Sequence, residues 1–266
     1  MNPERLRAMM IWGGTCVVFC LLVYLGTNEI ASKFDHHYDV YFEFEKDIPL
    51  VPWMIYFYTS FHLLLVLNFF IIKDPRVIKA FTLSLMFSSL IASFVFLLFP
   101  GELGFSRTDN ISGYEFMFNV LHEIDHPHNL YPSLHITFSV LTSFAMIDQT
   151  KPKWFHLFLT VWILLICASV VLVHQHHLFD VLTGLVLAYV AIKFVYRRYV
   201  PSAFWKCTII LLNYFYFSLL TLLEFNRLNH WFCVLLQKNI AYPNKQVLDM
   251  KKKYIVDLSE VKLSDL

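Results

Sequence analysis

The sequence predicts an all-α protein, a polytopic membrane helix bundle with six core transmembrane helices. Three observations lead to this fold class. Of the 266 residues, 58% are hydrophobic and only 15% are charged, whereas soluble globular domains carry about 25% charged residues. The hydrophobic residues form six runs without Lys, Arg, Asp or Glu, each near the roughly 20 residues that a spanning helix needs. The connections between these runs are alternately basic and acidic.

In chain order, the runs cover residues 8–28, 48–72, 80–100, 133–147, 154–173 and 181–192. The first run follows Arg5 and Arg7, as the apolar part of a signal peptide would. It is long enough to cross a bilayer and does not end in a small-residue cleavage site, so we expect a helix that stays in the protein. The fourth and sixth runs are short and need polar flanking residues to span.

Residues 201–266 follow this transmembrane domain of residues 1–200. We expect them to form an extra apolar segment and a polar C-terminal tail. The apolar segment, residues 207–223, fits three arrangements: a seventh span, a segment in the membrane interface, or a short hairpin with residues 231–236. The tail begins at about Lys238 and contains three consecutive lysines, so we expect it to be solvated.

The charged connections predict how the bundle is oriented. Basic side chains lie before the first run and after the second, fourth and sixth runs. The other connections are acidic: residues 29–47 hold six acids against two lysines, and residues 101–131 hold five against Arg107. Because positive connections stay in the cytoplasm, both ends of the core are expected there. With a net charge of +1 and no basic stripe, a nucleic acid is not an expected partner, whereas the lipid bilayer is.

Two histidine-containing stretches begin spans on the same, outer, side. The stretch YPSLH ends at His135, and the stretch HQHHLFD begins at His174 and ends at Asp180. Ionisable residues at membrane depth are costly unless they are used or paired. Ser133 is a good N-cap, and the free N–H groups of the following turn, from Leu134 onward, form an anion site beside His135.

His176 and Asp180 lie four residues apart and share a face of a helix that starts early enough. The carboxylate can then accept the N–H of one ring nitrogen and leave the other as a nucleophile or base. Arg107 is the only basic residue in the preceding outer connection, and a guanidinium suits phosphate. Two histidines with separate roles suit phosphoryl transfer, in which one attacks and the other protonates the leaving oxygen.

These residues resemble the motifs of the type 2 phosphatidic acid phosphatases, a family of integral-membrane lipid phosphatases. The second motif of that family, Pro-Ser-Gly-His, is similar to residues 132–135, and its third motif, Ser-Arg-x5-His-x3-Asp, is similar to residues 169–180 with Val170 in place of arginine. The first motif, Lys-x6-Arg-Pro, is matched by Arg107 alone. The stretches DHPHNLYPSLH and VHQHHLFDVLTG resemble a bacterial branch with PSLH and QHHxxD motifs, which implies a multi-pass protein of the bacterial inner membrane.

The resemblance implies a role for each matching residue and no cofactor or metal. His176 would be the nucleophile that forms a phosphohistidine, Asp180 would orient it, and His135 would protonate the leaving group. Ser133 and Arg107 would bind phosphate oxygens. Two cations of the family's phosphate site are missing, and the candidates to replace them are His122, His174 and His177.

Four functions follow from these residues. The first is a phosphatase acting on a membrane lipid phosphate, such as phosphatidate or an isoprenyl diphosphate. The second is a lipid phosphotransferase that resembles inositol-phosphoceramide synthases and uses an alcohol as acceptor. The third is an inactive, lipid-binding relative. A weaker reading makes His122, Asp125, His126 and His128 ligands of zinc or iron. The sequence leaves the oligomeric state open.

Overall fold

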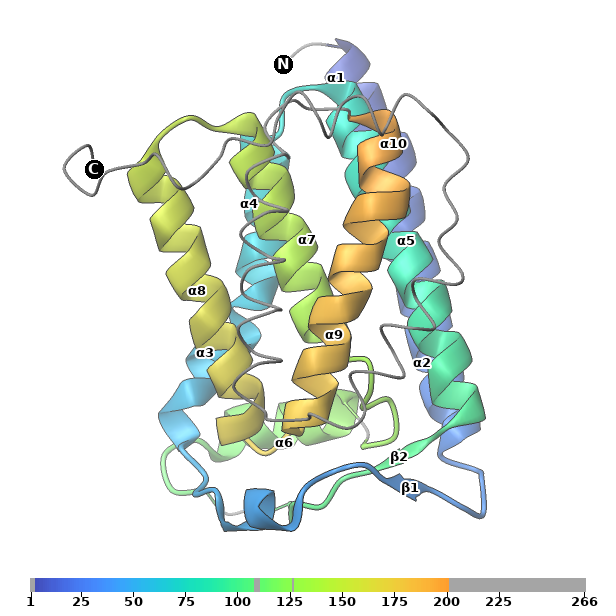
Figure 1. Cartoon of the computed structure of the whole chain (residues 1–266), viewed down its shortest axis with the longest axis vertical. Helices are drawn as coiled ribbons and strands as arrows, with labels where there is room; N and C mark the ends of the chain where they lie inside the picture. The colour runs from blue at the N-terminus through green and yellow to red at the C-terminus, as the bar shows by residue number, and fades with distance from the viewer. Residues whose placement is uncertain (1–2, 108–110, 126, 201–266) are drawn as a thin grey trace, which may run out of the picture. The chain divides into compact units, whose positions relative to one another are not determined.

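Long apolar helices make up most of the computed structural model, which describes residues 3–107, 111–125 and 127–200 (Figure 1). Within these residues the strands are β1 (Tyr38–Asp39) and β2 (Gly101–Glu102), which pair in parallel. The predicted all-α class is therefore confirmed. The chain divides after residue 202 into two units, and all described residues belong to the first. The apolar segment 207–223 and the polar tail lie outside the described residues.

The helices follow the apolar runs of the sequence. In chain order they are α1 (Pro3–Ala8), α2 (Gly14–Ala31), α3 (Ile55–Thr59), α4 (Phe61–Ile71), α5 (Pro75–Leu98), α6 (Glu115–Ile124), α7 (Leu134–Gln149), α8 (Lys153–Leu172), α9 (Leu178–Ala191) and α10 (Arg197–Tyr199). A π-helical turn joins α1 to α2 and another joins α9 to α10. Five continuous helical stretches are long and apolar enough to cross a membrane: Pro3–Ala31, Pro52–Ile71, Pro75–Leu98, Lys153–Leu172 and Leu178–Tyr199.

The sixth expected span, residues 133–147, is the short helix α7. Its 16 residues rise about 24 Å, less than the roughly 30 Å of a bilayer's apolar core. α7 packs against α4, α5, α8 and α9, and Figure 1 shows it in the middle of the bundle. Beside large apolar residues, its buried residues include four that are small and hydroxyl-bearing: Thr137, Ser139, Thr142 and Ser143. Such residues let helices approach closely, so α7 is surrounded by protein and does not need the length of a lipid-facing span.

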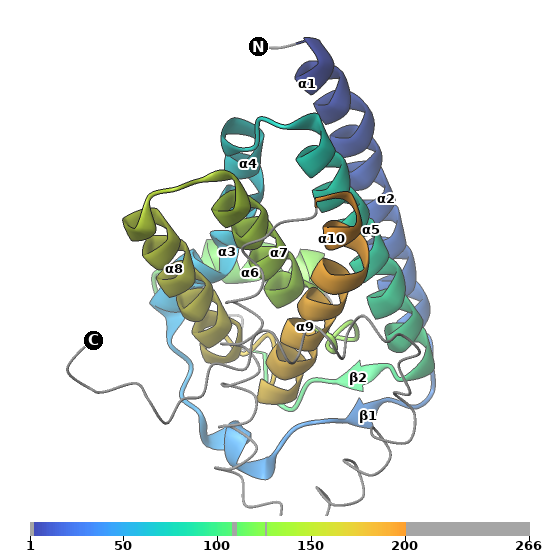
Figure 2. The ribbon, with the colours of Figure 1, turned by 45° about the horizontal axis from the view of Figure 1, so that its top comes forward.

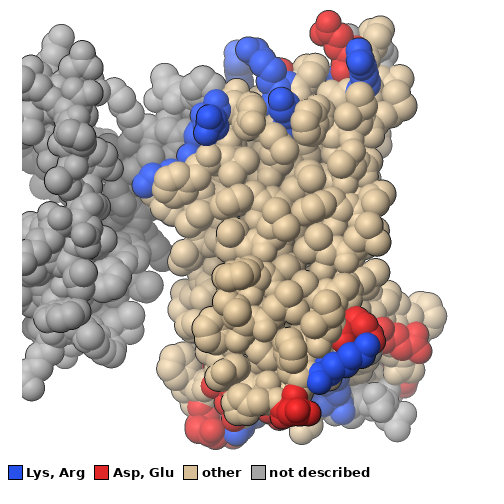
Figure 3. Space-filling model, turned by 90° about the vertical axis from the view of Figure 1, so that its right-hand side faces the viewer, with Lys and Arg blue, Asp and Glu red and all other residues tan. Residues whose placement is uncertain are grey.

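The surface of the bundle has two charged ends and an uncharged belt. Figure 3 shows mostly Lys and Arg with a few acids at one end, Asp and Glu with some basic side chains at the other, and an uncharged belt between them on this face. Large apolar side chains are exposed along the outer helices, for example Leu22 on α2 and Leu164 on α8. An apolar belt between charged ends is the surface that a bilayer requires.

The acid-rich end carries the connections that cover the starts of α7 and α9. Figures 1 and 2 both place β1 and β2 at the end of the bundle where α9 begins. α6 lies at the same end (Figure 1). Backbone hydrogen bonds tie these connections together: Tyr38 N–H donates to the carbonyl of Pro100 at 2.8 Å, and Gly101 N–H to that of His128 at 3.2 Å. This end therefore has an ordered cover over both histidine-containing stretches.

Candidate active site

Close packing of α7 against α9 brings the two histidine-containing stretches together. Ser133 N–H donates to the carbonyl of Asp180 at 3.1 Å, and the Thr137 hydroxyl donates to the carbonyl of Gly184 at 2.9 Å. A Cβ atom at Gly184 would lie 2.7 Å from the carbonyl oxygen of Ser133. Since that oxygen is backbone and cannot move aside, only glycine permits this approach.

The imidazole rings of His135 and His176 are in direct contact. His135 Nδ1 lies 3.3 Å from His176 Nε2, and the ring centroids are 5.4 Å apart. The other nitrogen of His176, Nδ1, lies 3.2 Å from Asp180 Oδ2. His176 and Asp180 are 3% and 1% exposed. The carboxylate therefore accepts a hydrogen bond from Nδ1–H of His176, which leaves the lone pair of Nε2 facing His135.

Asp180 holds this arrangement because it is also part of the start of α9. Its Oδ2 accepts the N–H of His177, the N-cap residue, at 2.8 Å. A carboxylate three residues into a helix satisfies one of the first free N–H groups and is favoured by the positive helix end. One side chain thus begins the helix and orients the imidazole four residues before it.

The start of α7 has the N-cap that the sequence predicts. Ser133 Oγ accepts the N–H of Ile136 at 3.5 Å, and Ser133 is fully buried. Leu134 is the first residue of the helix, and His135 is the second. The positive end of α7 therefore points at the His135–His176 pair, and an anion placed there is stabilised.

On its far side, His135 is hydrogen-bonded to a group that sequence reasoning did not find. Tyr58 Oη lies 2.9 Å from His135 Nε2 and 2.8 Å from Asp125 Oδ2. The other oxygen of Asp125, Oδ1, accepts the hydroxyl of Tyr24. Burial opposes the charge of Asp125, but the imidazoles of His135 and His176 and the two phenol hydrogen bonds outweigh it and lower the pKa of the carboxyl. Asp125 is therefore an anion that accepts both phenols.

Arg107 lies beside this carboxylate and joins two connections. Its Nη2 donates to the carbonyl of Asp125 at 2.7 Å and to Oε1 of Gln175 at 3.3 Å. Burial lowers the pKa of Arg107 in spite of the nearby Asp125, but a guanidinium starts so high that it stays charged. Arg107 thus supplies a fixed positive charge beside Asp125, whose carboxylate interacts with both histidines, and it also holds the Asp125 turn against Gln175.

A comparison with known families covers this part of the chain. Residues 105–203 match the family model described as PAP2 superfamily, and the matched stretch includes Arg107, Ser133, His135, His176 and Asp180. This stretch of the chain is similar to the PAP2 superfamily. No curated protein matches the chain. The match supports a function of the phosphatase or phosphotransferase type.

Two histidines that were expected to supplement the PAP2 site are directed elsewhere. His174 stacks on Phe105 with ring centroids 4.1 Å apart, and its Nε2 lies 2.9 Å from the carbonyl of Ile48. His177 Nδ1 lies 3.2 Å from Oε2 of Glu45. The structure thus gives both rings partners other than His135 and His176, and the prediction that His174 and His177 bind phosphate stays a prediction.

His177 has hydrogen-bonded neighbours on both ring nitrogens. In addition to Glu45 at Nδ1, its Nε2 accepts the N–H of Gly104 at 3.0 Å. Burial lowers the pKa of His177 although Asp180 and Glu45 oppose that shift, so the neutral form, which can accept from Gly104, is favoured. Glu45 is fully buried and also accepts the N–H of Leu178 at 2.8 Å. The pair anchors the outer connection to the start of α9.

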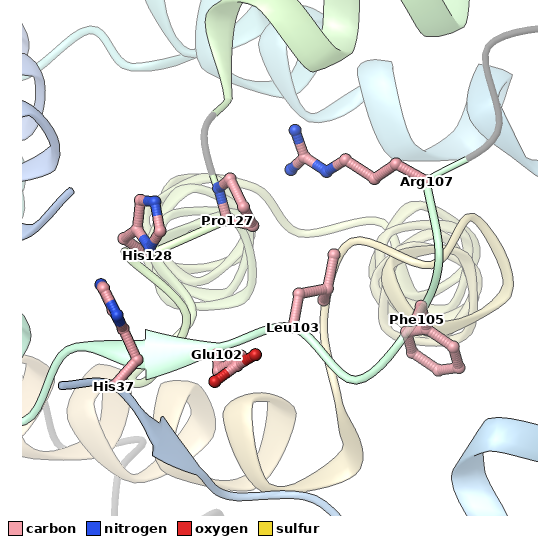
Figure 4. A pocket seen from close by; sticks show the side chains of 7 residues that line it. All are labelled: His37, Glu102, Leu103, Phe105, Arg107, Pro127 and His128. Carbon is pink, nitrogen blue, oxygen red and sulfur yellow. The ribbon is translucent and has the colours of Figure 1, made fainter. Parts of the chain in front are cut away.

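A cavity of about 270 Å³ opens next to Arg107 (Figure 4). It is lined by His37, Glu102, Leu103, Phe105, Arg107, Pro127 and His128. Figure 4 shows Arg107 along one side of the cavity and the rings of His37 and His128 on another. The cavity mixes one cation, one carboxylate and two imidazoles with apolar walls, which suits a small polar group attached to an apolar molecule.

The metal reading receives no support from the described residues. Among them, no group of three or more His, Cys, Asp or Glu side chains is arranged to hold a metal ion. His126, one of the four candidates, lies outside the described residues. Asp125 instead accepts the hydroxyls of Tyr24 and Tyr58.

Sequence reasoning did not predict that Tyr58, Asp125 and Gln175 lie beside the histidine pair and Arg107, or that Tyr24 donates to Asp125. Asp125 and Gln175 each had a signal, because they occupy fixed positions in the DxPxNxxPSLH and QHHxxD patterns. Tyr24 and Tyr58 had none: each is one of 14 tyrosines and lies within an apolar run far from the motifs.

Proposed function

We propose that this chain is an integral-membrane phosphatase that hydrolyses a lipid phosphate without a metal, through a phosphohistidine intermediate. One observation carries the proposal: His176 Nε2 faces His135 Nδ1 at 3.3 Å, while Asp180 occupies the other nitrogen of His176. A nucleophile with an orienting carboxylate and an adjacent acid are the groups that phosphoryl transfer in two steps needs.

In the first step, Nε2 of His176 attacks phosphorus, and an N–P bond forms as the bond from phosphorus to the lipid oxygen breaks. His135 gives its Nδ1 proton to that oxygen, so the lipid leaves as an alcohol. A phosphorus atom between the two nitrogens requires the rings to move apart from their contact distance. In the second step, His135 takes a proton from water, whose oxygen attacks phosphorus and releases phosphate and free His176.

The phosphate oxygens are proposed to lie against Arg107 and the start of α7. Arg107 supplies the positive charge, and Ser133 with the N–H of Leu134 supplies donors at the positive end of the helix. Arg107→Ala is expected to lower kcat/KM by about 10²-fold, the typical loss when one positioned donor to the transition state is removed. The cavity beside Arg107 is proposed to hold the polar part of the substrate.

The site is proposed to face the outside of the cell membrane. It lies at the acid-rich end of the bundle, whereas α1 and the starts of α5 and α8, which carry Arg5, Arg76 and Lys153, lie at the opposite end (Figure 1). The positive-inside rule places the basic end in the cytoplasm. This orientation is tested with Glu102→Cys in a chain whose five native cysteines have been replaced. Cells that express this variant are treated with a thiol reagent that cannot cross membranes. Labelling of intact cells supports the orientation, and labelling only after lysis contradicts it.

The function is tested by offering the purified full chain in detergent a panel of lipid phosphates, with and without a chelator. The panel contains phosphatidate, phosphatidylglycerophosphate and an isoprenyl diphosphate, and His176→Ala is the control. Phosphate release that needs His176 and survives the chelator supports the proposal. Activity that the chelator abolishes contradicts it, and no turnover of any lipid phosphate would indicate the inactive relative.

Added alcohols decide between water and an alcohol as acceptor. If phosphate release is unchanged by a range of alcohols, the phosphatase stands. If the phosphoryl group moves to the alcohol in proportion to its concentration, the chain is a phosphotransferase that uses the same phosphohistidine. Both outcomes need His135 and His176, because only the second nucleophile differs.

A further inference from the structure

A buried chain of hydrogen bonds links a carboxylate to the far side of His135. We propose that Asp125, acting through Tyr58, is a positioning residue that fixes which nitrogen of His135 gives its proton to the leaving group. The inference rests on the proposed function, in which His135 is the acid of the first step. It assigns a role to Tyr58, which lies outside the motifs from which that function was argued, and to Asp125, to which the proposed function gives none.

Three separate parts of the fold build the link. Tyr58 comes from α3, Asp125 follows α6, and His135 lies in the first turn of α7. Tyr58 Oη is 2.8 Å from Asp125 Oδ2 and 2.9 Å from His135 Nε2, while the carboxylate itself is 3.9 Å from that nitrogen. The phenol therefore lies between the carboxylate and the imidazole and connects them.

The direction of each hydrogen bond follows from counting protons. Asp125 is ionised and can only accept, so the one hydroxyl proton of Tyr58 goes to Asp125. The phenol oxygen can then only accept from His135, which places a proton on Nε2 of His135. The remaining nitrogen, Nδ1, is the one that faces His176, so the proton that His135 donates during catalysis is the one on Nδ1.

After that transfer, His135 is neutral and keeps its Nε2–H on Tyr58. Its Nδ1 then carries a lone pair that faces the phosphohistidine, ready to take a proton from water in the second step. Without the link, a neutral His135 is free to carry its proton on Nδ1 instead, and this tautomer cannot act as a base at Nδ1. The link therefore serves both steps through one fixed nitrogen.

The charged and titratable neighbours of His135 decide in which direction the pH profile of kcat/KM moves when one of them is replaced. Burial is the largest influence and opposes a proton on His135, and His176 before α9 and His62 on α4 oppose it by like charge. Asp125 after α6 and the hydrogen bond to Tyr58 on α3 favour the proton. Arg107 faces Asp125 and weakens its effect. Asp125 is the only carboxylate among these neighbours, so removing its charge makes the protonated form of His135 harder to keep.

The test compares three variants of the full chain on two substrates. Asp125→Asn and Tyr58→Phe break the link, whereas Tyr24→Phe removes the other phenol of Asp125 and leaves the link in place. Phosphatidate releases an alcohol that needs a proton, and p-nitrophenyl phosphate releases a phenolate that does not. The readouts are the ratio of kcat/KM for the two substrates and the pH profile of kcat/KM on phosphatidate. The ratio does not depend on how much of the variant is folded.

Asp125→Asn and Tyr58→Phe are expected to lower kcat/KM on phosphatidate by about 10²-fold and on p-nitrophenyl phosphate by less than about tenfold, because acid catalysis contributes on the order of 10²–10⁴. The alkaline limb of the profile is expected to move to lower pH in Asp125→Asn. Tyr24→Phe is expected to change the ratio by less than about threefold. Equal losses on both substrates, or an unmoved alkaline limb, would overturn the positioning role.

A separate measurement distinguishes a failure of the positioning role from a failure of the proposed function. Phosphohistidine on His176 is measured after rapid acid-free quenching of each variant with p-nitrophenyl phosphate. If phosphohistidine forms in wild type and in Asp125→Asn, but the ratio of kcat/KM for the two substrates is unchanged, the proposed function stands and the role given to Asp125 is wrong. If wild type turns over substrate without forming phosphohistidine on His176, the proposed mechanism itself is contradicted.

Discussion

His176 and His177 are neighbours in the chain with the same first partner and different surroundings. In each, Nδ1 lies 3.2 Å from a buried carboxylate, that of Asp180 for His176 and that of Glu45 for His177. The histidines are 3% and 1% exposed. By burial, residue type and carboxylate pairing they are equivalent.

The second ring nitrogen separates them. Nε2 of His176 faces His135, another titratable side chain, whereas Nε2 of His177 accepts a backbone N–H from Gly104. A histidine whose two nitrogens are both held by fixed partners supports structure, and one whose second nitrogen faces a reactive group can take part in chemistry. The carboxylate–imidazole pair alone therefore does not identify a catalytic histidine.

The largest expected effect is the difference in kcat between the variants His176→Gln and His177→Gln. His176→Gln removes the nucleophile and is expected to lower kcat by at least about 10⁴-fold, as loss of a covalent nucleophile does. His177→Gln keeps an amide donor for Glu45 and is expected to retain kcat within about threefold per folded molecule. Phosphate release, normalised to the folded fraction from gel filtration, measures both. Equal losses in the two variants would remove the distinction drawn here.

The two carboxylates are expected to differ in the same way, with a smaller effect. Asp180→Asn no longer favours the Nδ1–H tautomer of His176 and is expected to lower kcat by about 10²–10³-fold, less than loss of the nucleophile. Glu45→Gln is expected to lower the thermal unfolding midpoint while kcat per folded molecule stays within about threefold. If Glu45→Gln lost as much kcat as Asp180→Asn, Glu45 would belong to the site.

The next largest effect is expected at Gly184, where α9 packs closely against the start of α7. Gly184→Ala places a Cβ atom 2.7 Å from the Ser133 carbonyl and must push α7 away from α9. A shift of about 1 Å at a catalytic pair is expected to lower kcat by about 10²-fold or less. Gly26→Ala is the control, because no heavy atom lies within 4 Å of its added Cβ. Gly26→Ala with the same loss would show that the effect is not local.

The smallest expected effect is on stability. The folded pKa of His177 is lowered by burial, so an unfolded chain, with a histidine pKa of about 6.5, takes up a proton first as the pH falls. Stability is therefore fully present above about pH 6.5 and declines as the pH falls towards the folded pKa. Unfolding midpoints of wild type and His177→Gln between about pH 8 and pH 5 measure this. A slope that is as steep in His177→Gln would contradict it.

The sequence predicted the parts of the fold and of the site that depend on residues close together in the chain. Each apolar run became helical, and the predicted contact of His176 with Asp180 formed. The predicted reason was wrong, because α9 begins at Leu178 and His176 precedes the helix instead of sharing a helix face with Asp180. The contact of His135 with His176 followed from two adjacent helix starts on one side of the bundle. In each case the relevant residues are near in sequence or share an end of a span.

The missed features depend on contacts between distant segments. Glu45, 132 residues from His177, decides where that ring is held, and nothing in HQHH indicates that His176 and His177 have different partners. Val170, at the position of the family's missing arginine, is fully buried in the core. A charge placed there would start from a fully buried position, which is costly unless the charge is paired.

The central claim is that His135 and His176 meet around one phosphorus atom and that His176 is the residue phosphorylated. It is tested most directly by trapping the enzyme during turnover of phosphatidate labelled in its phosphate and locating the label by mass spectrometry. We expect the label on His176 in wild type and in His177→Gln, and no label in His176→Gln. Label on His177, or full turnover by His176→Gln, would contradict the claim.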